Sequence, residues 1–163
     1  MGIEIERKFL VQGPFPADPD AKTLVQGYIA REDGCTVRVR YDGSGYKLTV
    51  KGPSVGIARQ EFEWAIAAED GEPLLHSVCK TRIEKVRHRL PQGDLSWEVD
   101  VFSGDNTGLI VAEIELPGPD TPFNTPSWLG REVTQDPRFF NAALLDAPFK
   151  GWGVTYEALL QQP

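Results

Sequence analysis

The sequence predicts a mainly β protein with a few helices, an α+β fold built as one domain over residues 1–163. Short segments of alternating apolar and charged residues recur along most of the chain. Turn signals separate several of these segments, and helical patterns are few. A length of 163 residues, with 40% hydrophobic and 25% charged residues, is ordinary for a single globular domain.

Eight segments are predicted as β-strands because apolar and polar residues alternate within them. Asp33-Gly34 and Gly93-Asp94 are turn signals, and residues 36–50 are expected to form a hairpin. Several short strands with few helices favour an antiparallel sheet or barrel. The predicted strands are residues 2–11, 25–32, 35–42, 45–51, 59–67, 81–90, 95–102 and 109–116.

Three helices are expected between and after these strands. Residues 72–79 carry an apolar stripe at helical spacing. A second helix is expected to start at Asp136-Pro137 and to run to about Leu145, because Asp is a good N-cap and Pro suits the first turn. Residues 156–161 are predicted as a short last helix.

In each predicted strand, residues two apart point to the same face. One face is apolar throughout, and the other carries charges of both signs. An open sheet would place the apolar face against helices and the charged face in water. A closed barrel would place the charged face along its bore, with helices and loops covering the apolar outside. The alternation alone leaves both architectures open.

The charged face gathers carboxylates and bases that would be unfavourable to pack together without compensation. A divalent cation held by carboxylate oxygens, and a phosphate chain held by Arg and Lys, would compensate this charge. Mg²⁺ or Mn²⁺ is the natural metal for such ligands. The carboxylates are Glu4, Glu6, Glu61, Glu63, Glu98, Asp100, Glu113 and Glu115, and the bases are Lys8, Arg38, Arg40, Lys47, Lys51, Arg59, Lys85, Arg87 and Arg89.

The N-terminal run EIERKFLV contains Glu4-x-Glu6-x-Lys8. This motif resembles the E-x-E-x-K signature of the CYTH superfamily, also called triphosphate tunnel metalloenzymes. The resemblance extends over nearly the whole chain as a single CYTH domain. Further similar runs follow in the family's order: GY at 27–28, VRVR at 37–40, LTVKG at 48–52, RQEFE at 59–63, IEKVR at 83–87, WEVDVF at 97–102, VAEIEL at 111–116 and WLGREVTQDPRFFN at 128–141.

The resemblance implies a closed eight-stranded antiparallel β-barrel that forms a tunnel. It also implies a divalent-metal-dependent triphosphatase, similar to small bacterial inorganic tripolyphosphatases, that cleaves the terminal phosphate of tripolyphosphate or another triphosphate-containing substrate. Class IV adenylyl cyclases and thiamine triphosphatases share the fold and stay open as alternatives. A non-catalytic polyphosphate- or nucleotide-binding protein is a further alternative, although clustered carboxylates would not serve an anion binder.

Within such a tunnel, bases are expected to hold the triphosphate oxygens and carboxylates to hold Mg²⁺ or Mn²⁺. The resemblance also implies a catalytic pair, Lys8 and Tyr28, in which the lysine lowers the pKa of the tyrosine and makes it a better general base. The expected phosphate contacts are Lys8, Arg38, Arg40, Lys51, Arg59, Lys85 and Arg87, and the expected metal ligands are Glu4, Glu6, Glu63, Asp100, Glu113 and Glu115.

Other features limit the partners. A net charge of −7 counts against general nucleic-acid binding. No apolar run approaches the ~20 residues that span a bilayer, and the N-terminus lacks a signal-peptide h-region, so a cytoplasmic protein without a membrane partner is expected. The expected partner is a small-molecule triphosphate, bound by a monomer or a homodimer.

A few residues are expected away from this chemistry. Arg7 lies out of phase with the neighbouring charges and is predicted outside the bore. Cys35 and Cys79 are expected as free, buried or half-buried thiols. The tryptophans are predicted to pack rather than to stack on a substrate; they are Trp64, Trp97, Trp128 and Trp152.

Overall fold

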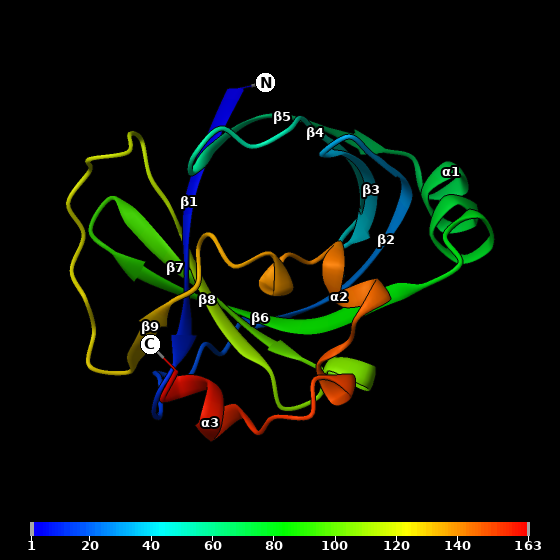
Figure 1. Ribbon diagram of the computed structural model, residues 1–163. Helices are drawn as coiled ribbons and strands as arrows, with labels where there is room; N and C mark the ends of the chain where they lie inside the picture. The colour runs from blue at the N-terminus through cyan, green and yellow to red at the C-terminus, as the bar shows by residue number, and fades with distance from the viewer. Residues whose placement is uncertain (1, 163) are drawn as a thin grey trace.

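The computed structural model describes residues 2–162. Its antiparallel strands join in one sheet, and β1 to β8 close into a ring because β1 pairs with β5 along one edge and with β8 along the other (Figure 1). The predicted closed eight-stranded fold is confirmed. The ring strands are β1 (Gly2–Val11), β2 (Lys22–Glu32), β3 (Cys35–Tyr41), β4 (Tyr46–Lys51), β5 (Ala58–Ile66), β6 (Arg82–Gln92), β7 (Leu95–Phe102) and β8 (Ile110–Glu115).

A ninth strand, β9 (Leu129–Glu132), was not predicted from the sequence. It pairs with the end of β1, where Val11 lies opposite Leu129 and the edge is no longer used by β5. Four residues are too few to show an alternating pattern, so only the free edge of β1 explains this strand.

The turn between β2 and β3 follows the predicted Asp33-Gly34 signal. Both residues adopt positive φ, 49° at Asp33 and 79° at Gly34, as a tight hairpin turn requires. The register of β2 against β3 shifts between Tyr28 and Ala30, which marks a β-bulge. Such bulges re-aim side chains beside them, and this one follows directly after Tyr28.

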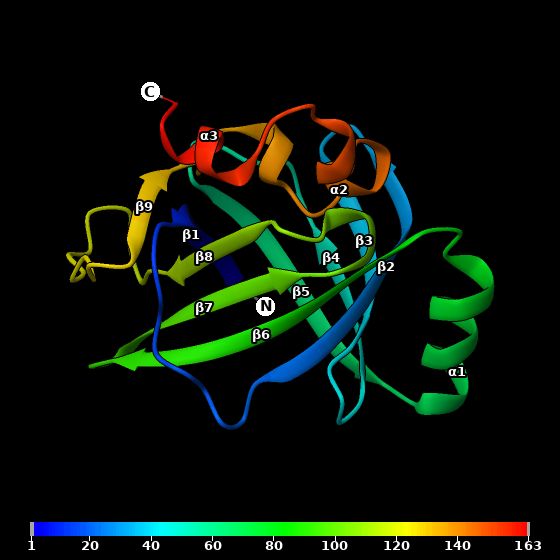
Figure 2. The ribbon, with the colours of Figure 1, turned by 90° about the horizontal axis from the view of Figure 1, so that it is seen from below.

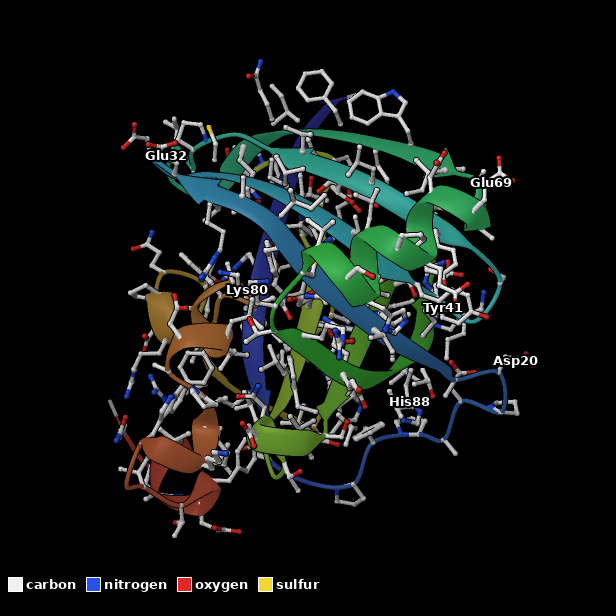
Figure 3. The ribbon with its side chains drawn as sticks, turned by 90° about the vertical axis from the view of Figure 1, so that its right-hand side faces the viewer. Asp20, Glu32, Tyr41, Glu69, Lys80 and His88 are labelled. Carbon is white, nitrogen blue, oxygen red and sulfur yellow. The ribbon has the colours of Figure 1, made fainter. Side chains whose placement is uncertain are left out.

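The helix expected at residues 72–79 begins earlier, as α1 (Ala68–Pro73), and continues as the π-helical turn η1 (Leu74–Val78). Gly71 and Pro73 are poor helix residues in isolation, but the glycine is required here. A Cβ at Gly71 would lie 2.3 Å from the Tyr46 ring. Close packing against β4 and β3 on the outside of the ring therefore sets this helix, and Figure 3 shows α1 lying over the outer face of the strands.

The C-terminal segment covers one end of the ring (Figure 2). The single helix expected from Pro137 to about Leu145 is wrong, because the chain forms η3 (Pro137–Phe139) and then α2 (Ala143–Asp146). The interruption buries Phe139 and Leu144 and turns Asn141 toward Lys85. Tertiary contacts thus override the local helical pattern. η4 (Phe149–Gly151) and α3 (Tyr156–Leu160) follow, and α3 fits the predicted last helix.

The hydrophobic core has two parts, one inside the ring and one outside it. Leu10, Ile83 and Phe102 lie in phase with the inward-facing charged residues of their strands, and they pack against the C-terminal segment at the end of the ring that it covers. The second cluster surrounds Trp97 and Trp128 on the outer face of the ring. Trp64 also lies outside the bore and stacks on Phe62 on the outer face of β5, but it is 51% exposed and does not belong to either core cluster.

Two smaller predictions are settled by exposure and contacts. Both thiols are free, but Cys35 is exposed rather than buried, because it lies beside the β2–β3 turn. Arg7 lies outside the bore as expected, with its Nε donating to Glu132 at 2.8 Å. No helix within residues 2–162 is long and apolar enough to span a membrane.

Candidate active site in the bore of the ring

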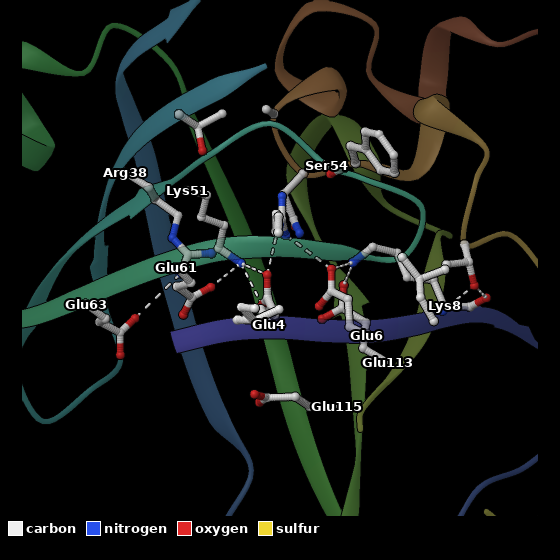
Figure 4. Close-up of a pocket in the computed structure, with 18 of the residues that line it drawn as sticks. Glu4, Glu6, Lys8, Arg38, Lys51, Ser54, Glu61, Glu63, Glu113 and Glu115 are labelled. Atoms are coloured by element: carbon white, nitrogen blue, oxygen red, sulfur yellow. Dashed lines mark hydrogen bonds and ion pairs between the residues drawn. The ribbon is translucent and has the colours of Figure 1, made fainter. Parts of the chain in front are cut away.

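The ring encloses a cavity of about 1290 Å³, and all eight ring strands contribute to its lining. Figure 4 shows carboxylates and bases from several strands converging in it. The charged face of the strands therefore lines the bore, which selects the closed architecture over the open sheet. The predicted site residues in the lining are Glu4, Glu6, Lys8, Tyr28, Arg38, Arg40, Lys51, Arg59, Glu63, Arg87, Glu113 and Glu115.

Lys85 and Asp100 are absent from that lining and lie behind it. Their side chains are each 1% exposed, and Lys85 Nζ lies 2.5 Å from Asp100 Oδ2. Burial lowers the pKa of Lys85 to about 8, although Asp100 opposes this shift. The alternation along the strands correctly predicted that both residues point inward, but the structure shows that they form a buried ion pair below the cavity surface.

Lys8 is buried between two carboxylates of the cavity. Its Nζ lies 2.8 Å from Glu6 Oε1 and also donates to Glu113. Burial alone would lower the pKa of Lys8, but Glu113 and Glu6 outweigh it, and the pKa is raised. Lys8 is therefore a fixed positive charge at neutral pH.

Glu4 accepts from two bases on neighbouring strands. Lys51 Nζ donates to it at 2.8 Å and Arg59 Nε at 2.7 Å. Lys51 also lies 2.7 Å from Glu61, and Arg59 lies 3.2 Å from Glu6. The β1–β5 register places Glu4 directly opposite Arg59, so strand pairing itself assembles this cluster.

Arg87 organises the wall formed by β6, β7 and β8. It donates to both carboxylate oxygens of Asp100 at 2.7 Å, to Glu113 at 3.1 Å, and to Glu98. Burial alone would raise the pKa of Asp100, but Arg87 and Lys85 lower it. The buried charges of this wall are thus paired with one another.

The wall formed by β2, β3 and β4 is less completely paired. Arg40 donates to Glu63 at 3.3 Å, and Arg38 donates to Thr49 Oγ1 at 3.2 Å. Burial, with help from neighbouring Arg38, lowers the pKa of Arg40. The Nε atoms of both arginines are buried without a hydrogen-bond partner among residues 2–162. This wall therefore keeps donors available for a ligand.

Glu115 stands apart from these ion pairs (Figure 4). Within the described part of the chain its carboxylate makes no hydrogen bond or ion pair. Burial raises the pKa of Glu115, and Glu4, Glu61, Glu98 and Glu6 raise it further. Strand register sets Glu6 directly opposite Glu115, where like charges repel. A cation beside Glu115 would relieve that repulsion.

The donors near Glu115 suit a hard divalent cation in their chemistry, because Mg²⁺ and Mn²⁺ prefer carboxylate oxygens. Among the described residues, however, no three His, Cys, Asp or Glu side chains are already arranged as ligands of one metal ion. Most of the carboxylates contact Lys or Arg instead. A bound anion would compete for those bases and free carboxylate oxygens.

Tyr28 lies in the bore, but its environment differs from the predicted one. Burial raises the pKa of Tyr28 above its ordinary value, and Arg38, Arg59 and Lys8 only partly offset this. Lys8 does lower the pKa of Tyr28, as expected, but burial has the larger effect, so the net shift is upward. The Tyr28 hydroxyl is therefore protonated at neutral pH.

Sequence reasoning missed three polar residues of the site. Thr49 and Gln26 are fully buried on inward faces, and Asn141 accepts from Lys85 at 3.2 Å. Thr49 lies in phase with Lys47 and Lys51, so the alternation could have indicated it. Asn141 gave no such signal, because its segment was expected to be helical.

The CYTH domain family profile matches residues 2–140. The chain belongs to the CYTH family. A CYTH relative named inorganic triphosphatase, from Acetivibrio thermocellus, is 44% identical over 155 residues, which cover 93% of this chain and 99% of the relative. An inorganic triphosphatase of Nitrosomonas europaea is 40% identical over 147 residues, covering 86% of this chain and 95% of the relative.

Solved structures resemble this CYTH chain as well. The crystal structure of an inorganic triphosphatase has 36% identity and a TM-score of 0.63, covering 87% of this chain and 97% of that one. A putative adenylate cyclase from Bacillus halodurans has 16% identity and a TM-score of 0.61, covering 72% of this chain and 83% of that one. At this lower identity the likeness concerns the fold alone.

Proposed function

We propose that this CYTH protein hydrolyses inorganic triphosphate inside the ring. The observation that carries the proposal is the cavity that all eight strands line with bases and carboxylates together. The relatives named inorganic triphosphatase, at 44% and 40% identity, support the same substrate class. A site for a neutral or cationic substrate would not need so many converging bases.

The bases of the lining are the proposed triphosphate contacts. Arg38 and Arg40 offer planar guanidinium groups suited to bidentate phosphate contacts, while Lys8 and Lys51 supply point charges. Each of these bases now contacts a carboxylate or lies within 4 Å of one. Triphosphate binding would exchange those contacts for phosphate oxygens. Arg59 and Arg87 complete the set.

Glu6 and Glu115, with Glu4, Glu63 and Glu113, are the proposed ligands of a divalent cation, Mg²⁺ or Mn²⁺. Bound there, the cation would neutralise charge on the phosphate oxygens. Asp100 is buried beneath the cavity and bonded to Lys85 and Arg87. We therefore propose that Asp100 and Lys85 hold Arg87 in place, rather than contact metal or phosphate directly.

The proposed reaction is in-line attack of water on a terminal phosphorus. The bond from that phosphorus to the bridging oxygen breaks, phosphate and pyrophosphate leave, and the protons of the water end on these two products. Lys8 binds the transferred phosphoryl oxygens, and the protonated Tyr28 hydroxyl orients the attacking water. Positioning and charge neutralisation supply most of the catalysis in such reactions.

The deciding experiment measures phosphate release from sodium tripolyphosphate with Mg²⁺, with Mn²⁺ and with a chelator. Rapid release that requires the metal, and that is lost in Glu4→Gln, is the expected result. Glu132→Gln is the matched control, because Glu132 contacts Arg7 outside the bore. A folded wild-type protein that binds tripolyphosphate but releases no phosphate would overturn the proposal.

The same assay with ATP separates hydrolysis from cyclisation. A hydrolase releases phosphate, whereas a cyclase yields cyclic AMP and pyrophosphate. We expect phosphate as the product and tripolyphosphate as the faster substrate. Cyclic AMP as the main product from ATP would favour a cyclase on the same fold.

A further inference from the structure

Gln26 is a buried amide for which the described residues supply no hydrogen-bond partner. Its exposure is 0%, and both Nε2 and Oε1 are unsatisfied. Buried side-chain amides are nearly always hydrogen-bonded in native proteins. An unsatisfied amide buried behind the lining of a ligand cavity therefore indicates a second arrangement in which it is bonded.

Gln26 faces the inside of the ring. The next residue, Gly27, faces outward, because a Cβ at Gly27 would lie 2.5 Å from the Cβ of Cys79 in the segment that covers β2 from outside. Adjacent strand residues point to opposite faces, so Gln26 and Tyr28 both point inward. Unlike Tyr28, Gln26 is not part of the cavity lining. It can act on a ligand only through a neighbour.

That neighbour is Arg40. Strand register places Gln26 directly opposite Arg40 on β3, where side chains on one face lie about 5 Å apart at Cβ. Arg40 Nε is buried without an acceptor in the described chain. The other end of its guanidinium lies 3.3 Å from Glu63. An unused acceptor and an unused donor thus belong to side chains that are direct neighbours across two strands.

We propose that Gln26 is a positioning residue for Arg40, and this inference rests on the proposed triphosphatase function. When triphosphate draws the guanidinium of Arg40 away from Glu63, Gln26 Oε1 accepts a hydrogen bond from Arg40 Nε. That bond fixes the plane of the guanidinium, so that its remaining N–H groups point at phosphate oxygens. The same movement frees a Glu63 carboxylate oxygen.

Two substitutions at Gln26 separate positioning from packing. Gln26→Met keeps the length of the side chain but removes both polar atoms, and Gln26→Glu keeps an acceptor. Calorimetric titration with sodium tripolyphosphate in a chelator measures binding without turnover. We expect Gln26→Met to weaken binding about tenfold, the value of one charge-assisted hydrogen bond, and Gln26→Glu to retain it. The melting temperature of ligand-free Gln26→Met should not fall.

A double-mutant cycle tests the assigned partner. Arg40→Lys removes the Nε donor, so adding Gln26→Met to it should weaken binding no further. Additive losses in the double variant would overturn the inference. So would equal losses in Gln26→Met and Gln26→Glu accompanied by a lower melting temperature, which is the result expected of a structural residue.

Failure of this inference and failure of the hydrolase proposal give different results. A wild-type protein that binds tripolyphosphate without hydrolysing it would sink the hydrolase proposal, while the binding comparison would still test Gln26. A wild-type hydrolase whose Gln26→Met variant binds tripolyphosphate as tightly would overturn only the role of Gln26. Absence of tripolyphosphate binding to the wild type would overturn both.

Discussion

Two walls of the cavity differ in how completely their polar groups are bonded. On β6, β7 and β8, the charged groups of Lys85, Arg87 and Asp100 are buried and share hydrogen bonds within one network. On β2 and β3, polar atoms of Gln26, Arg38 and Arg40 are equally buried but lack partners in the described chain. The ring therefore has one wall whose buried polar groups are fully bonded, on β6–β8, and one whose buried polar groups are not, on β2–β3; we call the second the open wall.

The difference indicates a division of work around the ring. A fully paired buried network keeps its geometry without a ligand, because breaking any of its bonds leaves a charge unpaired. A wall whose donors lack acceptors gains further hydrogen bonds only when an anion binds. We infer that β6–β8 provide the scaffold and that β2–β3 provide recognition.

The largest expected effect on stability comes from removing a charge from the paired network on β6–β8. Asp100→Asn removes the charge that Lys85 and Arg87 share, and leaves Lys85 buried without its carboxylate partner. Loss of one partner of a buried pair costs about 3–5 kcal/mol. Urea unfolding should therefore show a fall of this size in the free energy of unfolding.

Asp146→Asn is the matched control for that measurement. It removes an aspartate from an ion pair with Arg31, but Asp146 is 68% exposed. Surface pairs contribute about 0–1 kcal/mol, so this variant should be close to wild type. Equal effects of the two substitutions would contradict the view of β6–β8 as a buried scaffold.

Glu115→Gln is expected to change activity and stability in opposite directions. Loss of a charge at the proposed metal site should reduce phosphate release about 100-fold, in line with removal of one key electrostatic group. Burial and four neighbouring carboxylates raise the pKa of Glu115, so ionisation destabilises the folded state as pH rises through that pKa. The free energy of unfolding of the variant should therefore be slightly higher than that of wild type at neutral pH, by less than about 1 kcal/mol because the group is exposed to solvent.

That gain should disappear in acid, where Glu115 is protonated in both folded and unfolded chains. Chemical unfolding at pH 7 and at pH 3 would show the difference. A variant that is less stable than wild type at pH 7 would mean that Glu115 has a favourable partner, and the proposed cation site would have to move elsewhere.

The fold was predictable because strand alternation is local information. Charged residues two apart on every ring strand except β2 gave the inward face correctly, including Arg38, Arg40 and Arg87. Alternation cannot give depth, so Lys85 and Asp100 were expected at the cavity surface although they lie beneath it. Depth depends on how the strands tilt and on what the C-terminal segment covers.

The open wall was harder to foresee for a chemical reason. Gln26 and Thr49 are uncharged, so a search for converging charges passed over them, although both lie in phase with charged or catalytic candidates. Asn141 reaches the site because η3 ends early and the chain turns toward Lys85. The turn forms because it buries Phe139 and Leu144, and this burial cannot be predicted from the local sequence pattern.

The stability of the wall formed by β6–β8 should also depend on alkaline pH through Tyr156. Its hydroxyl accepts from Val11 N at 2.8 Å and donates to Ile110 O at 2.7 Å, which ties α3 to β1 and β8. Burial raises the pKa of Tyr156 from 10.0 to about 12. A raised pKa gives stability that is complete below pH 10 and is lost as pH rises to about 12.

The expected loss over that range is about 2 kcal/mol, allowing for partial exposure of the ring. Urea unfolding at pH 9, 10, 11 and 12 measures this loss. Tyr156→Phe, which cannot ionise, should be less stable than wild type at pH 9 but should lack this contribution to the alkaline decline. An unchanged decline in Tyr156→Phe would assign the alkaline sensitivity to other groups.

The smallest expected effect lies on the open wall, at Thr49. Its hydroxyl accepts from Arg38 at 3.2 Å and donates to Glu63 at 3.0 Å, so it links a base and a carboxylate that are both expected to change partners. Thr49→Val keeps the shape and should cost about 1 kcal/mol of stability. Because the phosphate contact of Arg38 would replace the lost bond, tripolyphosphate affinity should fall no more than about threefold. Thr23→Val on the exposed part of β2 is the control. If Thr49→Val lowered the free energy of unfolding as much as Asp100→Asn, the hydrogen bonds of both walls would be equally important for stability before substrate binds.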